Sequence, residues 1–293
     1  MLFRSEKVAA ALPELGRCPI EMAKSSITSD AVRKGAITHI QTSYTVDRMA
    51  SDGQNILYTS YNDREPHVIA YCVTDDRQNQ DEKQAWNCQR VQDMIWWKTI
   101  QKFVCATQNA IYTVDRTVPN FKILCVKRGS WSKVNVAESD SKFFLHFVTT
   151  DVKNQQINRI SVYAADFTLT SVLDITKQRF FSLSTSFCVK DQTIVSARVA
   201  LEGGRKELYV NFFDRWMNQL GWCCLGSCDY SIEIRTDGNG YFVSSGDRKL
   251  YRVTPDGRYR SIDLKDEGDC LAVLDNQRIA VSKGRSSIEL ITY

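Results

Sequence analysis

The sequence predicts an all-β fold built from many short antiparallel strands. From Val46 onward, short runs of alternating apolar and polar residues are broken by Gly, Asn, Asp and Pro, which is the pattern of strands joined by tight turns. No long helical periodicity interrupts these runs. The 293 residues are 43% hydrophobic and 25% charged, so the chain is long and apolar enough to bury a large core.

The strands recur in six groups with a period of about 40 to 50 residues, which is the size of a four-stranded propeller blade. Each group opens with two apolar strands and a polar turn, as in MASDGQNILYTSY from Met49. Equivalent pairs begin at Trp97, Val134, Phe181, Ile232 and Leu271. A third strand, such as HVIAYCV or KLYRVT, and a more polar fourth strand complete the unit. We therefore predict a six-bladed β-propeller with four antiparallel strands per blade. A seven-bladed ring or a pair of β-sandwiches is the alternative.

The sixth group contains only three strands and ends in SIELITY. The segment ITHIQTSY, residues 37–44, precedes the first group and matches the missing fourth strand. We expect it to pair with residues 286–293 and to close the ring, because an open strand edge invites aggregation. The predicted propeller spans residues 37–293, and residues 1–36 form an N-terminal extension with a short helix and a loop.

This architecture resembles the NHL-type propellers of RING/B-box proteins over roughly residues 37–293. The tripeptide that names that family is missing from the chain. The Trp-Asp and Gly-His dipeptides of WD40 repeats are also missing, and Gly-Gly occurs once, at Gly203–Gly204, which disfavours kelch repeats. The resemblance implies an interaction platform and makes single-stranded RNA an alternative ligand.

The cysteines indicate a reducing compartment. Most of the ten lie within apolar runs such as KFVCAT and TSFCV, so we expect reduced core thiols in a cytoplasmic protein. No apolar run is long enough to span a membrane, and the first residues lack the apolar segment of a secretory leader. We expect no membrane association.

Support for catalysis or metal binding is weak. His39, His67 and His146 lie in separate predicted blades and share no ligand spacing. The cysteines of GWCCLGSC lack the second pair that a zinc site commonly needs, and RTDGNGYF fits a hairpin turn better than a calcium loop. On the innermost strands, only Asn135 and Glu233 are candidate ligands. We expect no enzyme and no cofactor; a calcium-dependent, lactonase-like hydrolase is the least favoured alternative.

Charged residues sort unevenly between the two faces of the predicted ring, although the net charge is only +4. Basic residues recur in the turns between second and third strands and in the connections between blades, which share one face. Acidic residues concentrate on the other face, among them Asp52, Asp140 and Asp237. The alternative is that all these loops are charged only because they are solvated.

We predict that the basic face of a monomeric propeller binds a protein or peptide, acidic in character, with single-stranded RNA as the competing ligand. The predicted contact residues are Arg48, Arg64, Trp96, Trp97, Lys98, Lys153, Arg159, Arg179, Arg205, Lys206, Arg248 and Arg285. Because neighbours on a strand point to opposite sides, we expect one of Trp96 and Trp97 in the core and the other at the rim.

Overall fold

The computed structural model describes residues 37–61, 67–74, 81–117, 120–176, 186–229, 231–268, 270–275, 277–282 and 285–293. The predicted N-terminal extension, residues 1–36, lies outside this part of the chain. The regular elements within it are all β-strands.

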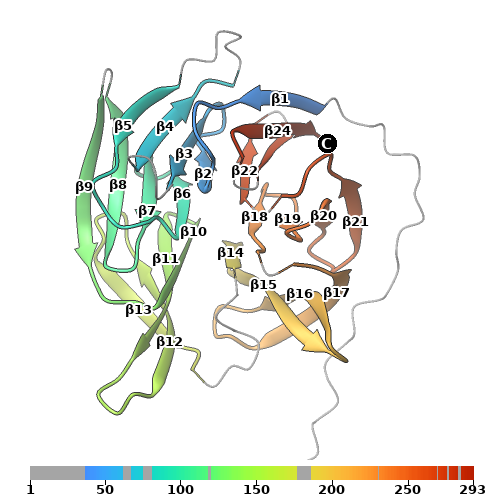
Figure 1. The fold of residues 1–293 in the computed structure, drawn as a ribbon. Coiled ribbons are helices and arrows are strands. Elements are labelled where there is room, and N and C mark those ends of the chain that lie inside the picture. Colours follow the sequence, from blue (N-terminus) through green and yellow to red (C-terminus); the bar gives the residue numbers. More distant parts are fainter. Residues whose placement is uncertain are drawn as a thin grey trace, which may run out of the picture.

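Six sheets of four antiparallel strands surround a central axis, so the prediction of a six-bladed β-propeller is confirmed (Figure 1). Blade one comprises β2 (Arg48–Ser51), β3 (Ile56–Ser60), β4 (Val68–Cys72) and β5 (Glu82–Ala85). Blade two comprises β6 (Asp93–Trp97), β7 (Lys102–Ala106), β8 (Ala110–Thr117) and β9 (Asn120–Arg128). Blade three comprises β10 (Lys133–Ser139), β11 (Lys142–Thr150), β12 (Gln156–Tyr163) and β13 (Leu169–Asp174).

The second half of the chain completes the ring. Blade four comprises β14 (Ser186–Lys190), β15 (Thr193–Glu202), β16 (Arg205–Phe213) and β17 (Gln219–Ser227). Blade five comprises β18 (Ile234–Thr236), β19 (Tyr241–Ser244), β20 (Lys249–Val253) and β21 (Tyr259–Asp263). Blade six comprises β22 (Cys270–Leu274), β23 (Arg278–Ser282), β24 (Ser287–Thr292) and β1 (Ile37–Gln41). The first strand named in each blade is innermost, and it lies against the innermost strands of both neighbouring blades.

The apolar alternation of the sequence fills the spaces between blades. On β6, Met94 and Trp96 pack toward blade one, whereas Ile95 and Trp97 pack toward blade three. Successive side chains of a strand point to opposite faces, so each inner strand supplies two interblade cores. The outermost strands are more polar because one of their faces meets solvent, as the largely exposed β13 shows.

The predicted closure of the ring is confirmed. β1 pairs antiparallel with β24, with Ile37 opposite Ile291 and Gln41 opposite Ser287. The first and last strands of the described chain therefore lie side by side in blade six (Figure 1). Ile40 is the one buried residue of β1, and it packs in the core shared by blades six and one.

Two predicted strands are displaced in the structure. The innermost strand of blade two is Asp93–Trp97 instead of a strand that begins at Trp97, because residues 98–101 form a turn with hydrogen bonds from Ile100 N to Trp97 O and from Gln101 N to Lys98 O. The innermost strand of blade four is Ser186–Lys190, and the predicted strand at 181–185 lies outside the described residues.

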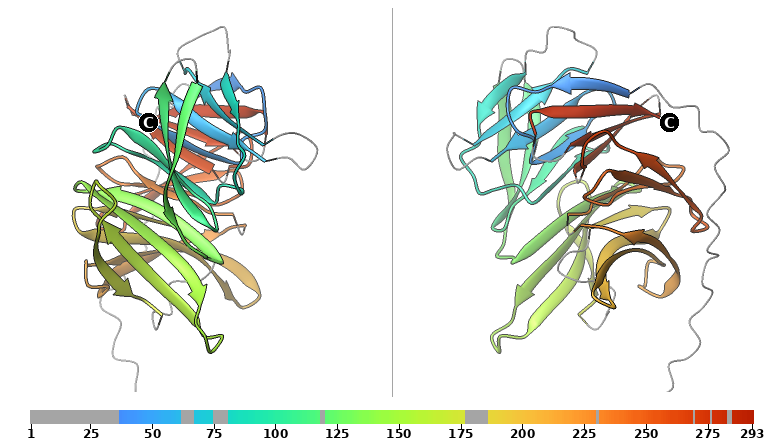
Figure 2. Two further views of the ribbon diagram at one scale, coloured as in Figure 1. Left: turned by 90° about the vertical axis from the view of Figure 1, so that its left-hand side faces the viewer. Right: turned by 45° about the vertical axis from the view of Figure 1, so that its right-hand side comes forward.

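The hairpin of β11 and β12 projects beyond the rest of the ring in both further views (Figure 2). Five of the nine cysteines in the described part of the chain are buried. Within that part, no helix has the length and apolar character needed to cross a membrane.

Candidate functional site

A cavity of about 940 Å³ lies on the ring axis, and we call it the funnel. Its wall is made by the ends of the innermost strands and by the turns that join first and second strands. We call the face with these turns the funnel face; it also carries the turns between third and fourth strands. The opposite face carries the turns between second and third strands and the connections between blades.

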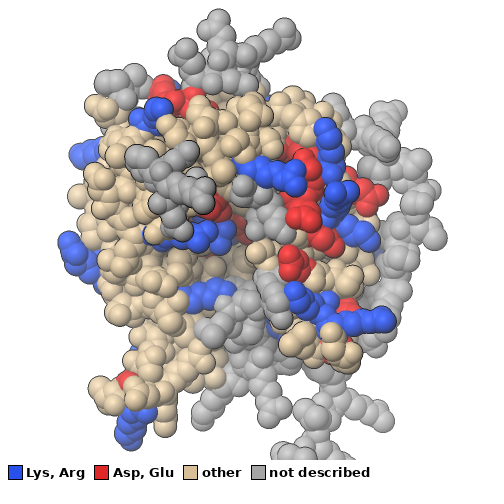
Figure 3. All heavy atoms as spheres, viewed as in Figure 1, with Lys and Arg blue, Asp and Glu red and all other residues tan. Residues whose placement is uncertain are grey.

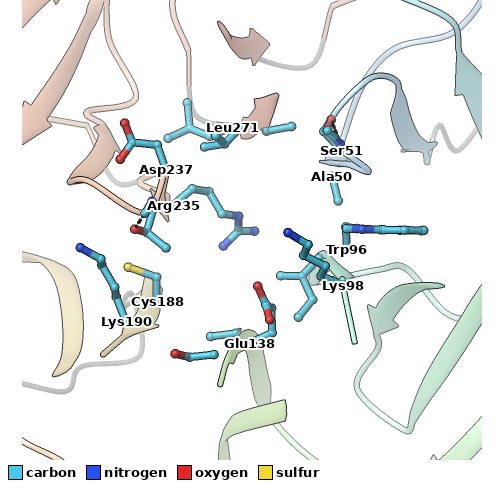
Figure 4. Close-up of a pocket in the computed structure, with 18 of the residues that line it drawn as sticks. Ala50, Ser51, Trp96, Lys98, Glu138, Cys188, Lys190, Arg235, Asp237 and Leu271 are labelled. Carbon is cyan, nitrogen blue, oxygen red and sulfur yellow. Dashed lines mark hydrogen bonds between the residues drawn. The ribbon is translucent and has the colours of Figure 1, made fainter. Parts of the chain in front are cut away.

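The floor of the funnel is a buried ion-pair network. Arg235 on β18 extends toward the middle of the cavity (Figure 4). Its guanidinium donates to Asp93 Oδ1 at 2.5 Å and to the Met94 carbonyl at 3.2 Å, and it also pairs with Glu233. The Arg235, Asp93 and Glu233 side chains are 12%, 4% and 8% exposed. Arg235 therefore links blade five to blade two across the ring axis.

The two carboxylates of this network also bind the backbone of the next blade. Asp93 Oδ2 accepts the amide of Val136 on β10 at 2.8 Å, and Glu233 Oε2 accepts the amide of Leu271 on β22 at 2.7 Å. Burial raises the pKa of Glu233 to about 7, and the positive charge of Arg235 opposes that rise. The network thus fixes the spacing of four blades around the axis.

The rim of the funnel carries carboxylates from five of the six first turns. They are Asp52, Asp140, Asp191, Asp237 and Asp275. Several cap their own turns: Asp237 Oδ1 accepts the amides of Asn239 and Gly240 at 2.8 and 2.7 Å. This confirms the prediction of a hairpin at RTDGNGYF, since β18 and β19 flank it.

Four basic and six acidic side chains line the funnel, although the whole chain carries a net positive charge. Arg252 pairs with Asp237 at 2.9 Å, and Lys190 pairs with Asp191 at 3.4 Å. Lys98 and Glu138 point into the cavity from the neighbouring blades two and three (Figure 4). Burial raises the pKa of Glu138, and the positive charge of Lys98 partly opposes the shift. The funnel can therefore accept a charged, extended segment, and its excess of carboxylates favours a positive one.

Trp96, Trp97 and Lys98 lie at the funnel-face end of β6, so their predicted place beside the basic loops of the opposite face is wrong. The cause is the displaced innermost strand of blade two described above. The predicted alternation is nevertheless present: Trp97 is fully buried against Phe143 and Phe167, while Trp96 is half-buried and lines the funnel.

The other described members of the predicted set lie toward the opposite face. They are Arg48, Lys153, Arg159, Arg205, Lys206, Arg248 and Arg285. Arg159 lies within β12, and the rest lie at the ends of their strands or in the adjoining loops. Arg64 and Arg179 lie outside the described residues. The four arginines expected on one surface, Arg159, Arg205, Arg248 and Arg285, share this end of their blades.

Several of these basic side chains have acidic neighbours. Lys206 pairs with Asp229 at 3.3 Å, and Arg285 pairs with Asp266 at 3.0 Å. Basic and acidic groups intermingle over blades five and six instead of forming one basic area (Figure 3). Asp229 and Asp266 were missed when the loops were sorted by charge, because they lie at the ends of neighbouring loops. Arg48 instead donates to the Gln92 carbonyl at 2.7 Å and so tethers the start of blade two.

Of the residues considered for catalysis, His146 and Glu233 have structural contacts. His146 is fully buried, bonds Asn158 through Nε2 at 2.7 Å, and burial lowers its pKa to about 4. Asn135 lies on β10 in blade three, whereas Glu233 lies beside β18 in blade five and binds Arg235. Among the residues that the structure describes, no group of three or more His, Cys, Asp or Glu side chains is placed to hold a metal ion.

Sequence reasoning missed Asp93 and Arg235. Asp93 was overlooked because the innermost strand of blade two was placed four residues too late. Arg235 had a visible signal: Glu233 and Arg235 alternate with Ile232 and Ile234, so both charges share one face of an innermost strand. A buried position for two charged neighbours of opposite sign indicates an ion pair.

The comparisons with known proteins identify the fold alone. No protein-family model and no curated protein matches the sequence. A chain in a crystal structure of the mitotic checkpoint complex superposes with a TM-score of 0.58 and 7% identity, covering 100% of this chain and 99% of that one. BamB from Moraxella catarrhalis gives a TM-score of 0.46 with 10% identity, covering 89% and 95% of the two chains.

Proposed function

We propose that this propeller is a non-enzymatic interaction module that binds a protein partner by taking a peptide segment into the funnel. The observation that carries the proposal is the funnel itself, a cavity of about 940 Å³ that is open on the funnel face and has the Arg235–Asp93 pair at its floor. A cavity of this size matches the range in which proteins enclose ligands. The proposal transfers the predicted peptide site from the basic face to the funnel face.

The chemistry at the floor favours binding over hydrolysis. A metal-dependent hydrolase needs carboxylates that are free to hold a divalent cation. Here the guanidinium of Arg235 stands between Asp93 and Glu233 and already neutralises both. A divalent cation at this place would be repelled by Arg235.

The burial of five described cysteines fits a reducing compartment, so we place the module in the cytoplasm. Single-stranded RNA is the competing ligand, by the resemblance to NHL-type propellers. It would use unpaired cations of the opposite face, and several of these already have carboxylate partners. Protein is therefore the favoured partner class.

The test is selection from a displayed library of random twelve-residue peptides, repeated on two matched variants. Ser139 lines the funnel and Ser171 lies exposed on the outer strand β13. Ser139→Trp should obstruct the funnel and abolish binding of the selected peptides, because the added indole occupies part of the space that they need. Ser171→Trp adds the same side chain elsewhere and should leave binding unchanged.

Circular dichroism and thermal melting of both variants show whether they remain folded. The proposal is wrong if the library yields no enriched peptide, or if Ser139→Trp binds the enriched peptides as well as Ser171→Trp. It is also wrong if an RNA oligonucleotide binds with a steep salt dependence and Ser139→Trp leaves that binding unchanged.

A further inference from the structure

Trp216 is an exposed tryptophan in a turn of blade four. All six tryptophans of the chain lie within the described residues, and Trp216 alone is mostly exposed, at 65%. It lies between β16 and β17, in the turn of blade four that joins the third and fourth strands. This turn belongs to the funnel face.

The same five-residue turn occurs in blades three, four and five, at residues 164–168, 214–218 and 254–258. In each, the first amide donates to the fifth carbonyl and the fourth amide donates to the first carbonyl, at 2.8 to 3.0 Å. The fourth residue has a positive φ in all three: Phe167, Met217 and Gly257. Because the three turns share this geometry, the residues at their third position can be compared directly.

The third position holds Asp166, Trp216 and Asp256 in the three turns. The two aspartates accept the amide two residues later, from Thr168 and Arg258, and so stabilise the turn. In blade four, Asp214 takes this role by accepting the amides of Trp216 and Asn218 at 2.9 and 2.8 Å. Asp214 thus stabilises the turn without any contribution from the indole of Trp216.

The turn that carries Trp216 is anchored in the core and is linked through Arg215 to the first turn of the same blade. Met217 is 5% exposed and anchors the turn in the core between blades three and four. The Arg215 guanidinium lies 4.1 Å from the centroid of the indole and donates to Gln192 Oε1 at 3.3 Å. Gln192 follows Lys190 and Asp191, which line the funnel.

We infer that Trp216 anchors the docking of the same partner segment that enters the funnel, and this inference rests on the proposed function. The partner is a protein segment with a lysine or arginine for the carboxylate-rich funnel and a proline or aliphatic residue for the indole. The guanidinium of Arg215 already packs on the indole of Trp216. The partner is therefore expected to contact the indole with an apolar group. Exposed tryptophans are typical of the residues that dominate protein interfaces.

The test uses the peptides selected from the random library on the wild-type protein. Trp216→Asp installs the residue that the same turn carries in blades three and five, so the fold should be retained. It should weaken peptide binding at least tenfold, although the added negative charge would favour a basic peptide. Trp216→Phe should restore most of the affinity, and the enriched peptides should combine a basic residue with a proline or aliphatic residue.

Leu201→Asp is the matched control. Leu201 is 66% exposed, as exposed as Trp216, and lies at the opposite face in the hairpin of β15 and β16. Its replacement should leave binding unchanged. Binding by Trp216→Asp within twofold of wild type would overturn the inference, as would a set of acidic enriched peptides.

The two proposals fail separately. If Ser139→Trp abolishes binding and Trp216→Asp does not, the funnel binds the peptide and the role of Trp216 is wrong. If Trp216→Asp abolishes binding and Ser139→Trp does not, Trp216 anchors a partner and the funnel is not its site.

Discussion

Arg235 and Asp93 are 142 residues apart in sequence, yet the guanidinium Nη2 lies 2.5 Å from the carboxylate Oδ1 at the centre of the ring. One residue belongs to blade five and the other to blade two, so the contact forms only when the ring is complete. Asp93 and Glu233 also accept backbone amides of the next blades. Arg235 therefore neutralises the two carboxylates that hold the inner strands of neighbouring blades together.

Removal of this arginine should destabilise the whole propeller. In Arg235→Ala, two buried carboxylates lose their cation, and we expect the free energy of unfolding to fall by about 3 to 5 kcal/mol. Arg258→Ala is the matched control, because its pair with Asp256 is about half exposed, and it should change stability by within about 0.5 kcal/mol. Urea denaturation measures both. Equal stability of the two variants would show that the axial network contributes nothing.

The raised pKa of Glu233 predicts a pH dependence of stability. Burial raises this pKa from 4.5 to about 7, so the folded state holds the proton more tightly than the unfolded chain does. The resulting stability is fully present below pH 4.5 and is lost as the pH rises through about 7. Relative to Glu233→Gln, the wild type should lose on the order of 1 to 3 kcal/mol between about pH 5 and about pH 8.

The difference in unfolding free energy between the wild type and Glu233→Gln isolates the contribution of Glu233. His146, whose pKa burial lowers to about 4, contributes with the opposite sign, because its stability is lost as the pH falls toward that value. That contribution is present in both proteins and cancels in their difference. A difference in unfolding free energy that stays constant across the pH range would refute a titrating Glu233.

Closure of the ring by β1 predicts unequal effects of two isoleucines on one strand. Ile40 is 5% exposed and Ile37 is 44% exposed. Ile40→Ala should cost about 2 to 4 kcal/mol, because it removes buried methyl groups between blades six and one. Ile37→Ala should change stability by within about 0.5 kcal/mol. If both variants melt like the wild type, or if a chain that begins at Val46 does so, β1 is dispensable for closure.

The buried thiols should resist alkylation in the folded protein. Burial raises the pKa of Cys72, Cys188 and Cys223 to about 12, so the reactive thiolate is scarce near neutral pH. We expect iodoacetamide to modify these cysteines only after denaturation, as mass spectrometry of native and unfolded samples would reveal. Cys188 is the most demanding case because it also lines the funnel. Rapid native labelling of Cys188 would contradict its buried state.

The ring and its closure could be predicted because alternation and turn residues are local signals. The pairing of residues 37–41 with 287–291 could be predicted because the last of the six repeats lacks a fourth strand. Blade two was shifted because the apolar residues Trp97 and Ile100 were interpreted as part of a strand, although Gln101 takes a φ of 52° and ends a turn. Asp93 meanwhile reads as a loop residue, and only its contacts across the ring explain its burial.

The candidate site was harder to predict than the fold. Loop charges could be sorted by face, but the ion pairs of Lys206 and Arg285 depend on acids in loops that the repeat does not align. Trp216 was missed because its exposure follows from Met217 taking the buried place in the turn. The three turns of this type could have been aligned by sequence, and that alignment would have shown the exceptional tryptophan.

The location of a bound peptide tests the central claim most directly. A crystal structure of the protein with a peptide selected from the random library should show the peptide within the funnel, with a basic side chain near Glu138 and an apolar one against Trp216. A peptide bound instead on the opposite face, among Arg159, Arg205, Arg248 and Arg285, would contradict the account.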